Sequence, residues 1–161
     1  MEAAVALKRY VEDDRLMNVM EKYAKYINET FGREEGKLRG YPGHQEIELA
    51  LIKMYRETDN ELYLNMAEYF VNERGESPYF FDEEARARGE KIADTMHLMQ
   101  GLPSKPHDYL YSQSHALARE QEEAFGHSVR ACYFYSGMAD VAMETNDQEL
   151  FSACKSIWKD I

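Results

Sequence analysis

The stretch "IELALIKMYRETDNELYLNMAEYF", residues 47–70, decides the fold class. Its apolar side chains recur at helical spacing on both sides of the short acidic turn "RETDN" (56–60). Asp and Asn suit such turns, and their side chains can cap the helix that follows. The stretch therefore predicts a helical hairpin, with one helix over about 46–58 and a second over about 60–74.

The same unit recurs on either side of this hairpin. Acidic turns of the same kind occur in "YVEDDRLM" (10–17) and "METNDQELF" (143–151). Strand signatures are missing, and the four prolines lie between or outside the periodic segments. The further helices predicted in this way cover about 2–11, 15–31, 118–145 and 148–160. The sequence thus predicts an all-α fold of three hairpins (about 2–31, 46–74 and 118–160), repeating after roughly 45 residues and then roughly twice that.

The predicted helices alternate in character along the chain. The first, third and fifth are apolar on most sides, as in "AAVAL" (3–7) and "VRACYFYSGMADVAM" (129–143), whereas the others carry one apolar stripe. A helix that is apolar all round is buried on both sides, while a striped helix faces water on one side. The alternation predicts an inner ring of helices wrapped by an outer ring. Such hairpins cannot bury their faces alone and stack into solenoids or closed toroids.

A long stretch, about 75–117, separates the second and third hairpins and holds three of the four prolines. A connection of this length inside a compact domain is usually functional or disordered. A short helix near Glu83–Lys91 fits its pattern. The aromatic runs "SPYFF" (77–81) and "HDYLYSQSH" (107–115) predict a packed excursion over one end of the barrel.

The composition of this 161-residue chain limits the kinds of partner that it can bind. Aromatic residues make up 12% and hydrophobic residues 44%, which indicates one globular domain with a real core. The formal net charge of −11 repels phosphate backbones and anionic lipid, so nucleic acid and membrane surfaces are not expected partners. No window is apolar enough to span a membrane, and no signal pattern opens the chain. The two cysteines, Cys132 and Cys154, fall inside apolar helical patterns, which favours small buried side chains in a reducing, cytoplasmic setting.

Two Gly-His steps stand before apolar helices, Gly43-His44 and Gly126-His127. Glycine permits a sharp entry or the close approach of another backbone. At a helix start the positive end of the dipole favours neutral imidazole, which both donates and accepts a hydrogen bond and so suits a sugar hydroxyl. Either histidine alone is more often a satisfied residue near a helix start than a ligand-binding one, and the occurrence of both at the same repeat position makes the two interpretations about equal. In a toroid, however, the starts of the inner helices converge on one end of the central cavity, which predicts His44 and His127 as binding residues.

Other polar residues are weaker candidates. His115 and Arg119 are four apart and could share one helix face, where Arg119 could position a ligand, although a structural ion pair is its commoner role. The abundant carboxylates are expected on solvated faces. Metal-ligand spacing, phosphate loops, dinucleotide fingerprints and Ser-His-Asp patterns are all missing. The sequence therefore predicts no cofactor bound by this chain.

These residues resemble a known family. The segments "GYPGHQEIELALIKMYRETDNELYLNMAEYFVNERG" (40–75) and "YSQSHALAREQEEAFGHSVRACYFYSGMADVAMETND" (111–147), with the opening "EAAVAL" (2–7), are similar to glycoside hydrolase family 127, the β-L-arabinofuranosidases. The resemblance covers nearly the whole chain. It implies an (α/α)6 barrel of six helical hairpins, of which this chain supplies about half as a single partial domain.

The resemblance also implies a role for the histidines. In that family, histidines at the inner-helix entrances contact the sugar, and by motif His44 and His127 match them. A third Gly-His of the repeat would fall just before Met1, so the chain is expected to be a fragment of a longer barrel. Relatives use a zinc-bound cysteine nucleophile and a separate glutamate as acid/base, in segments beyond this chain. No catalytic residue is therefore expected here, and the chain alone should be inactive toward L-arabinofuranosides.

Two alternatives stay open at this point. Open repeat ends expose apolar inner helices, so the chain could be a stand-alone helical-repeat interaction module that self-associates or meets a complementing chain. Another (α/α)6 carbohydrate-active enzyme, such as an epimerase, is the second alternative, with a poorer motif match.

Overall fold

The computed structural model describes residues 1–90 and 109–161, and every regular element within those ranges is helical. The α-helices are α1 (Glu2–Val11), α2 (Arg15–Thr30), α3 (Ile47–Thr58), α4 (Glu61–Glu73), α5 (Phe80–Ala87), α7 (Ser128–Thr145) and α8 (Gln148–Asp160). A 3₁₀ turn, η1 (Ala118–Glu120), precedes α7. The predicted all-α fold class is confirmed.

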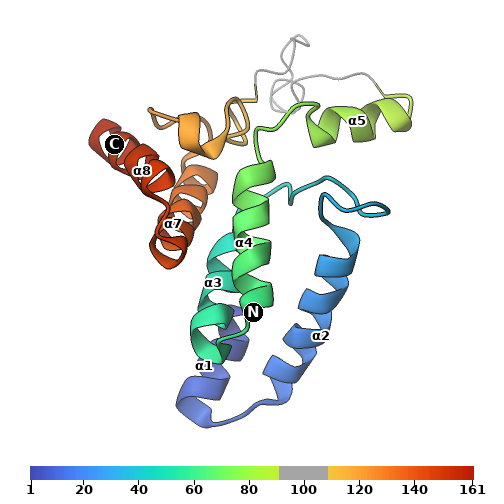
Figure 1. The fold of residues 1–161 in the computed structure, drawn as a ribbon, viewed down its shortest axis with the longest axis vertical. Coiled ribbons are helices and arrows are strands. Elements are labelled where there is room, and N and C mark those ends of the chain that lie inside the picture. The colour runs from blue at the N-terminus through green and yellow to red at the C-terminus, as the bar shows by residue number, and fades with distance from the viewer. Residues whose placement is uncertain (91–108) are drawn as a thin grey trace.

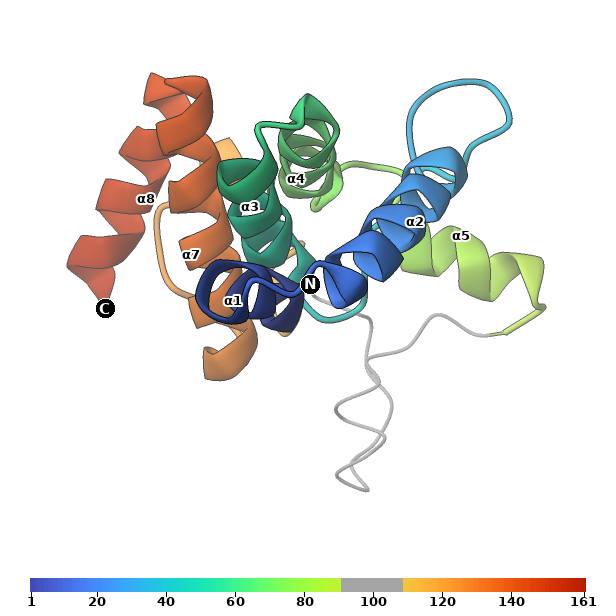
Figure 2. The same ribbon diagram turned by 90° about the horizontal axis from the view of Figure 1, so that it is seen from below.

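The helices form three hairpins that stand in a row (Figures 1 and 2). Helix α1 packs on α3 and α3 packs on α7, while α2 packs on α4 behind them. Because the same layer holds α1, α3 and α7, the structure reproduces the predicted inner row. The loops that lead into α3 and α7 lie together at one end of the molecule, beside α5 (Figure 1).

Burial departs from the predicted alternation in two helices. Helix α1 was expected to be buried on most sides, but only Ala4 and Val5 are buried in it. Helix α4 was expected to face water, yet it is the most buried outer helix, with Tyr63, Phe70 and Val71 almost fully covered. The reason is the position in the row. Helix α4 packs against α2, α3 and α7, whereas α1 packs mainly against α2 and α3.

The three inner helices end in the same way. Each runs into a non-glycine residue in the left-handed region, which turns the chain back toward the outer helix: Glu12 (φ 58°), Asp59 (φ 57°) and Asn146 (φ 55°). The predicted capping is confirmed in the second and third hairpins, where the side chains of Asn60 and Asp147 accept hydrogen bonds from backbone N–H groups of the next helix. These shared ends fix a common register for the repeat.

The start of the third hairpin differs from the prediction. A helix was expected from about 118, but α7 begins at Ser128, and within 118–127 only η1 is helical. Gly126, at φ +84°, and the buried side chain of Gln121, which donates to the carbonyls of Gln113 and Ala116, hold the intervening chain as a packed loop. Tertiary hydrogen bonds thus override the helical pattern of "AREQEEAF".

The long connection between the second and third hairpins carries α5, close to the short helix predicted at 83–91. Phe80 and Phe81 of this segment pack their rings on Tyr41, which covers the loop before α3 as the aromatic pattern predicted. The middle of the predicted 75–117 connection, residues 91–108, lies outside the described residues.

The absence of a membrane-spanning helix and the burial of the two cysteines were also predicted. None of the helices there is long and apolar enough to cross a lipid bilayer. Both cysteines are free, as expected, but Cys132 is exposed on α7 and only Cys154 is partly buried, so the prediction of a buried side chain was wrong for Cys132.

Candidate functional site

His44 lies in the loop that leads into α3. Its Nδ1 lies 3.1 Å from the Gln45 carbonyl oxygen and 3.3 Å from Glu46 Oε1. A proton on Nδ1 would be donated to that carbonyl, which leaves Nε2 as a hydrogen-bond acceptor. The ring also meets Tyr133 of α7 edge-on at 5.9 Å. Because 38% of the side chain is exposed, a ligand can reach the imidazole.

His127 is the N-cap residue of α7. Its backbone N–H donates to the Tyr111 carbonyl at 3.3 Å, and its ring meets the Tyr111 ring edge-on at 5.4 Å. The imidazole makes no capping hydrogen bond, and its buried Nδ1 has no partner among the described residues. A buried ring nitrogen without a partner is unusual and marks a place where a ligand hydroxyl could complete the hydrogen bonding.

Arg130, the third residue of α7, connects the loops of the two histidines. Its guanidinium donates to the Gly43 carbonyl, next to His44. The same guanidinium lies 4.9 Å above the ring of Tyr111, which packs on His127. The structure therefore brings the two Gly-His loops together at one end of α3 and α7. This is the convergence that the repeat predicted.

A buried arginine donates hydrogen bonds to both loops. Arg74, the C-cap residue of α4, is completely buried and donates to the carbonyls of Pro42 at 2.7 Å and Ser112 at 3.2 Å. Its guanidinium carbon lies 4.6 Å above the Tyr41 ring and 5.4 Å from the Phe134 ring centre. One charged side chain thus fixes the loop before α3 and the loop before α7 against each other.

Glu48 is the acidic partner of this arginine. Its carboxylate is 1% exposed, with Oε1 3.9 Å from Arg74 Nη2, and neither oxygen accepts a hydrogen bond from the described residues. Burial raises the pKa of the Glu48 carboxyl, and the Arg74 charge opposes that rise. Gly137 of α7 lies directly against Glu48, and a Cβ atom at 137 would come within 2.9 Å of the Glu48 Cβ, so a side chain there would push α7 away from α3. The pair is buried where α3, α4 and α7 meet.

This pair has a consequence for the pH dependence of stability. A carboxyl whose pKa is raised on folding contributes stability that is present below its ordinary pKa of 4.5 and is lost as pH rises through the folded pKa. The Glu48→Gln variant carries no such titration. We expect the free energy of unfolding of the parent, minus that of the variant, to fall from about pH 4.5 upward. Urea unfolding at a series of pH values measures the difference, and a constant difference would contradict the prediction.

Two glutamines extend the buried polar layer. Gln45 donates through Nε2 to the Ser112 carbonyl at 2.6 Å and to Gln113 Oε1 at 2.7 Å. Gln113 in turn donates to the Phe125 carbonyl at 2.8 Å. Both side chains are fully buried. The layer of Arg74, Glu48 and these glutamines was missed by the sequence reasoning, although a charge within the apolar run "IELAL" is a signal for a buried ion pair.

His115 and Arg119 do not belong to this cluster. They do not share a helix face, since His115 lies in an irregular segment, where its ring packs edge-on against Phe125 at 5.2 Å, and Arg119 lies in η1. Arg119 binds Asp147, the N-cap residue of α8, and Asn72 of α4. The structural ion pair weighed in the sequence is therefore the role that the structure gives to Arg119.

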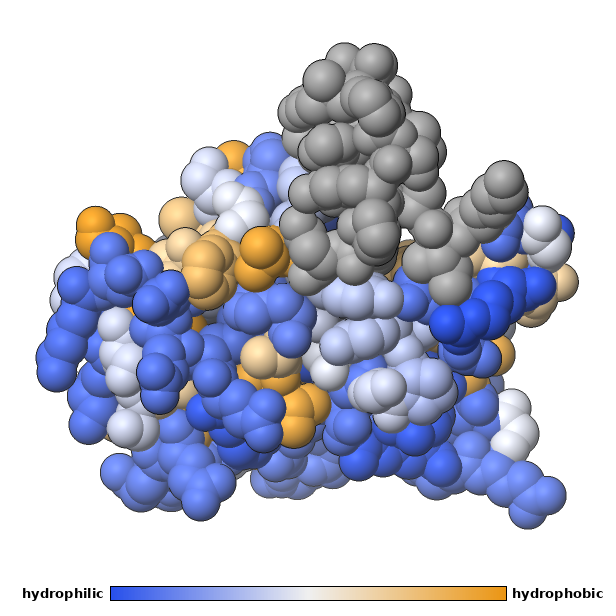
Figure 3. All heavy atoms as spheres, turned by 90° about the horizontal axis from the view of Figure 1, so that it is seen from above, coloured by the Kyte–Doolittle hydropathy of each residue, from blue (hydrophilic) through white to orange (hydrophobic). Residues whose placement is uncertain are grey.

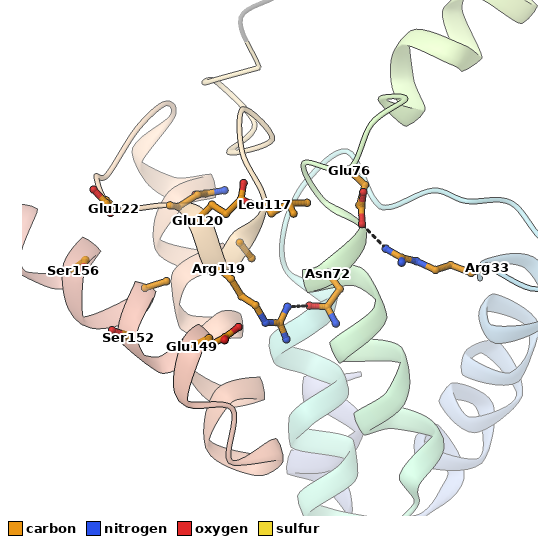
Figure 4. A pocket seen from close by; sticks show the side chains of 13 residues that line it. Arg33, Asn72, Glu76, Leu117, Arg119, Glu120, Glu122, Glu149, Ser152 and Ser156 are labelled. Carbon is orange, nitrogen blue, oxygen red and sulfur yellow. Dashed lines mark hydrogen bonds and ion pairs between the residues drawn. The ribbon is translucent and has the colours of Figure 1, made fainter.

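Arg119 also lines a cavity of about 690 Å³ between α4, η1 and α8 (Figure 4). The other charged groups there are mainly carboxylates, including Glu76, Glu120 and Glu149. This cavity is on the outer side, and neither His44 nor His127 lines it. A smaller hollow of about 370 Å³ lies between α3 and α7 next to the histidine loops, and its lining is Leu49, Ser128, Val129, Cys132, Tyr133 and Ser136.

The described residues do not form a metal site. No three of their His, Cys, Asp and Glu side chains converge in the way that a bound ion requires. Burial raises the pKa of the Cys154 thiol to about 11, so this sulfur is not a thiolate ligand or nucleophile at neutral pH. The residues that the structure describes therefore do not fit the zinc of the resembled family.

Comparison with known proteins identifies the family. The profile described as "Beta-L-arabinofuranosidase, GH127 catalytic domain" matches residues 1–161. The chain belongs to family GH127. It is 36% identical over 162 aligned residues to the non-reducing end β-L-arabinofuranosidase of Bifidobacterium longum subsp. longum, covering all of this chain and 23% of that enzyme.

Solved GH127 structures agree with this assignment. A GH127 β-L-arabinofuranosidase from Geobacillus stearothermophilus T6 matches with a TM-score of 0.88 and 46% identity, over 99% of this chain and 24% of that one. A second GH127 β-arabinofuranosidase matches with a TM-score of 0.79 and 32% identity, over 99% of this chain and 21% of that one. The chain thus has the (α/α)6 barrel type of GH127 and spans about a quarter of the length of these relatives.

Proposed function

We propose that this chain forms part of the sugar-binding wall of a GH127 β-L-arabinofuranosidase barrel. The observation that carries the proposal is the joining of the two Gly-His loops through Arg130 and Tyr111, at the open end of the inner helices. His44 and His127 would bind hydroxyl groups of an L-arabinofuranoside. The hollow beside them is mainly apolar and has the hydroxyl-bearing side chains of Ser128 and Tyr133 in its lining, and apolar walls with a few polar groups are typical of small-ligand sites.

The reaction proposed for the whole barrel is hydrolysis of a terminal β-L-arabinofuranosyl bond. The 161 residues supply binding groups and carry no group to which we assign catalysis, so we expect no hydrolysis by this chain alone. Zinc is a proposal for full-length relatives and not for this chain. A reducing compartment such as the cytoplasm remains our expectation, in keeping with the two free thiols.

The proposal is tested by titrating the chain with methyl β-L-arabinofuranoside and following the histidine ring signals by NMR. We expect His44→Ala and His127→Ala each to weaken binding about tenfold, since each removes hydrogen bonds to the sugar. Glu149→Gln, in the outer cavity, is the matched control and should leave the affinity unchanged. Equal affinity in the parent and both histidine variants would refute the proposal. Loss in Glu149→Gln alone would move the sugar to the outer cavity.

A further inference from the structure

Two buried glutamines connect the His44 loop to the His127 loop. Gln45, directly after His44, donates through Nε2 to Gln113 Oε1 at 2.7 Å. Gln113 donates through its own Nε2 to the Phe125 carbonyl at 2.8 Å, two residues before His127. The two side-chain amides therefore form a continuous hydrogen-bonded connection between the loops, which we call the glutamine bridge.

Backbone carbonyls at both ends fix the orientation of the glutamine bridge. Gln45 Nε2 also donates to the Ser112 carbonyl at 2.6 Å, so this end of the amide is the NH2 group. Gln113 then presents its oxygen to Gln45 and its nitrogen to the Phe125 carbonyl. Because a carbonyl can only accept, neither amide can turn over without losing hydrogen bonds. The glutamine bridge therefore has one favourable arrangement.

The backbone of Gln113 indicates that its side chain is needed. Its φ is 53°, in the left-handed region, which disfavours residues with a side chain and favours glycine. A glycine at this position would remove the amide and with it the whole glutamine bridge. The unfavourable backbone angle is therefore offset by the hydrogen bonds that the amide makes, and backbone strain of this kind clusters at functional sites.

Burial makes the glutamine bridge a stiffer connection than the contact through Arg130. Both glutamine side chains are fully covered by the described residues. Seen from the end of the molecule that carries the histidine loops, most of the visible surface outside the grey atoms is hydrophilic (Figure 3). Water at this surface competes with the exposed hydrogen bond from Arg130 to the Gly43 carbonyl. The buried amides are shielded from that competition, so breaking their hydrogen bonds costs more.

We propose that Gln45 and Gln113 are positioning residues, which set the separation of His44 and His127 and thereby the fit of the sugar between them. This inference rests on the proposed function, because the histidines are the groups that would touch the sugar. The glutamines act only through them, since both amides are buried. A break anywhere in the glutamine bridge releases both loops, so two breaks weaken binding no more than one.

The histidine ring signals in NMR spectra test the glutamine bridge without a ligand. Gln45→Met removes the donors beside His44 and should shift the ring signals of His127, at the far end. Gln113→Met should in the same way shift those of His44. Gln121→Met is the matched control, because this glutamine is also buried but donates to two carbonyls of the same loop. It should leave the His44 signals in place.

Two outcomes of this experiment would overturn the proposal. The first is a His127 ring whose signals stay unchanged in Gln45→Met. The second is a His44 ring that responds to Gln121→Met as strongly as to Gln113→Met, because the effect would then belong to any buried amide of the loop. Far-UV circular dichroism of each variant confirms that the shifts come from folded chains.

The parent chain gives a measurement that does not depend on the folding of any variant. The Nε2 protons of Gln45 and Gln113 should exchange with solvent far more slowly than those of Gln148, which is exposed. Exchange at the same rate in all three side chains would overturn the proposal, because water would then reach the glutamine bridge and compete for its hydrogen bonds.

Affinity for methyl β-L-arabinofuranoside connects the histidine positions to binding. We expect Gln45→Met and Gln113→Met each to weaken binding about tenfold, and the double variant to bind about as well as either single one. Independent losses would multiply to about a hundredfold and would contradict a shared bridge. Ring signals that move while the affinity keeps its parent value would overturn the positioning role. A parent chain that does not bind the sugar refutes the proposed function instead, and the ring signals alone then decide whether the glutamine bridge sets the histidines.

Discussion

Replacing Arg74 with methionine should lower the free energy of unfolding by about 3–5 kcal/mol. The substitution leaves Glu48 as a buried carboxylate without a counter-charge. It also removes the donors to the Pro42 and Ser112 carbonyls, which water cannot replace in a fully buried position. Methionine fills similar volume, so the loss reports on charge and hydrogen bonding more than on packing. Urea unfolding followed by far-UV circular dichroism measures it.

Two further variants separate the causes. Arg15→Met removes an arginine whose side chain is 90% exposed and is paired with Asp13, so it should leave the free energy of unfolding nearly unchanged. Combining Arg74→Met with Glu48→Gln removes the uncompensated carboxylate. The double variant should therefore be more stable than Arg74→Met alone. A loss below about 1 kcal/mol in Arg74→Met would show that the pair is not a structural anchor.

The second large effect is expected at Gly126, directly before His127. This glycine has φ +84°, where an alanine costs about 1–2 kcal/mol. A Cβ atom there would also overlap the Leu110 carbonyl oxygen and lie 2.6 Å from Gln113 Nε2. Because one obstacle is backbone, the loop has to move. We expect Gly126→Ala to destabilise the chain by about 3 kcal/mol or more and to displace the His127 ring.

Matched glycines provide the controls for this experiment. Gly36 has φ +87° but open space around it, so Gly36→Ala reports the cost of the backbone conformation alone, about 1–2 kcal/mol. Gly43, which precedes His44, lacks a positive φ, and its nearest neighbour would be Phe81 Cζ at 3.8 Å. Gly43→Ala should therefore be within about 0.5 kcal/mol of the parent. Thermal unfolding of the three variants measures the loss of stability of each relative to the parent. Equal losses in Gly36→Ala and Gly126→Ala would contradict the clash.

These glycines also show how far the sequence reasoning reached. The two Gly-His steps look alike in the sequence, and the structure does bring their loops together. In space the steps differ, because His127 is the N-cap of α7 while His44 precedes the N-cap of α3 by two residues. Spacing along the chain does not report the backbone angle of Gly126 or the carbonyl that approaches it.

The hairpins were predictable because their contacts are local. Periodic apolar positions and acidic turns predicted the helices on either side of Asp59 and Asn146, and apart from the start of α7 their ends are correct to within a few residues. The start of α7 was not predictable in this way, since buried glutamines from distant segments compete for the backbone groups that a longer helix would use. The Arg74–Glu48 pair depends on three helices at once, so no single window of the sequence contains it.

The unequal cover of the helices in the row has a consequence for local unfolding. Helices α3 and α4 have neighbours on both flanks, so they can open only when the hairpins beside them also come away. Helix α1 buries only two residues and can detach at a small fraction of the global free energy. Amide protons should therefore exchange fastest at the N-terminal hairpin and slowest in the middle one.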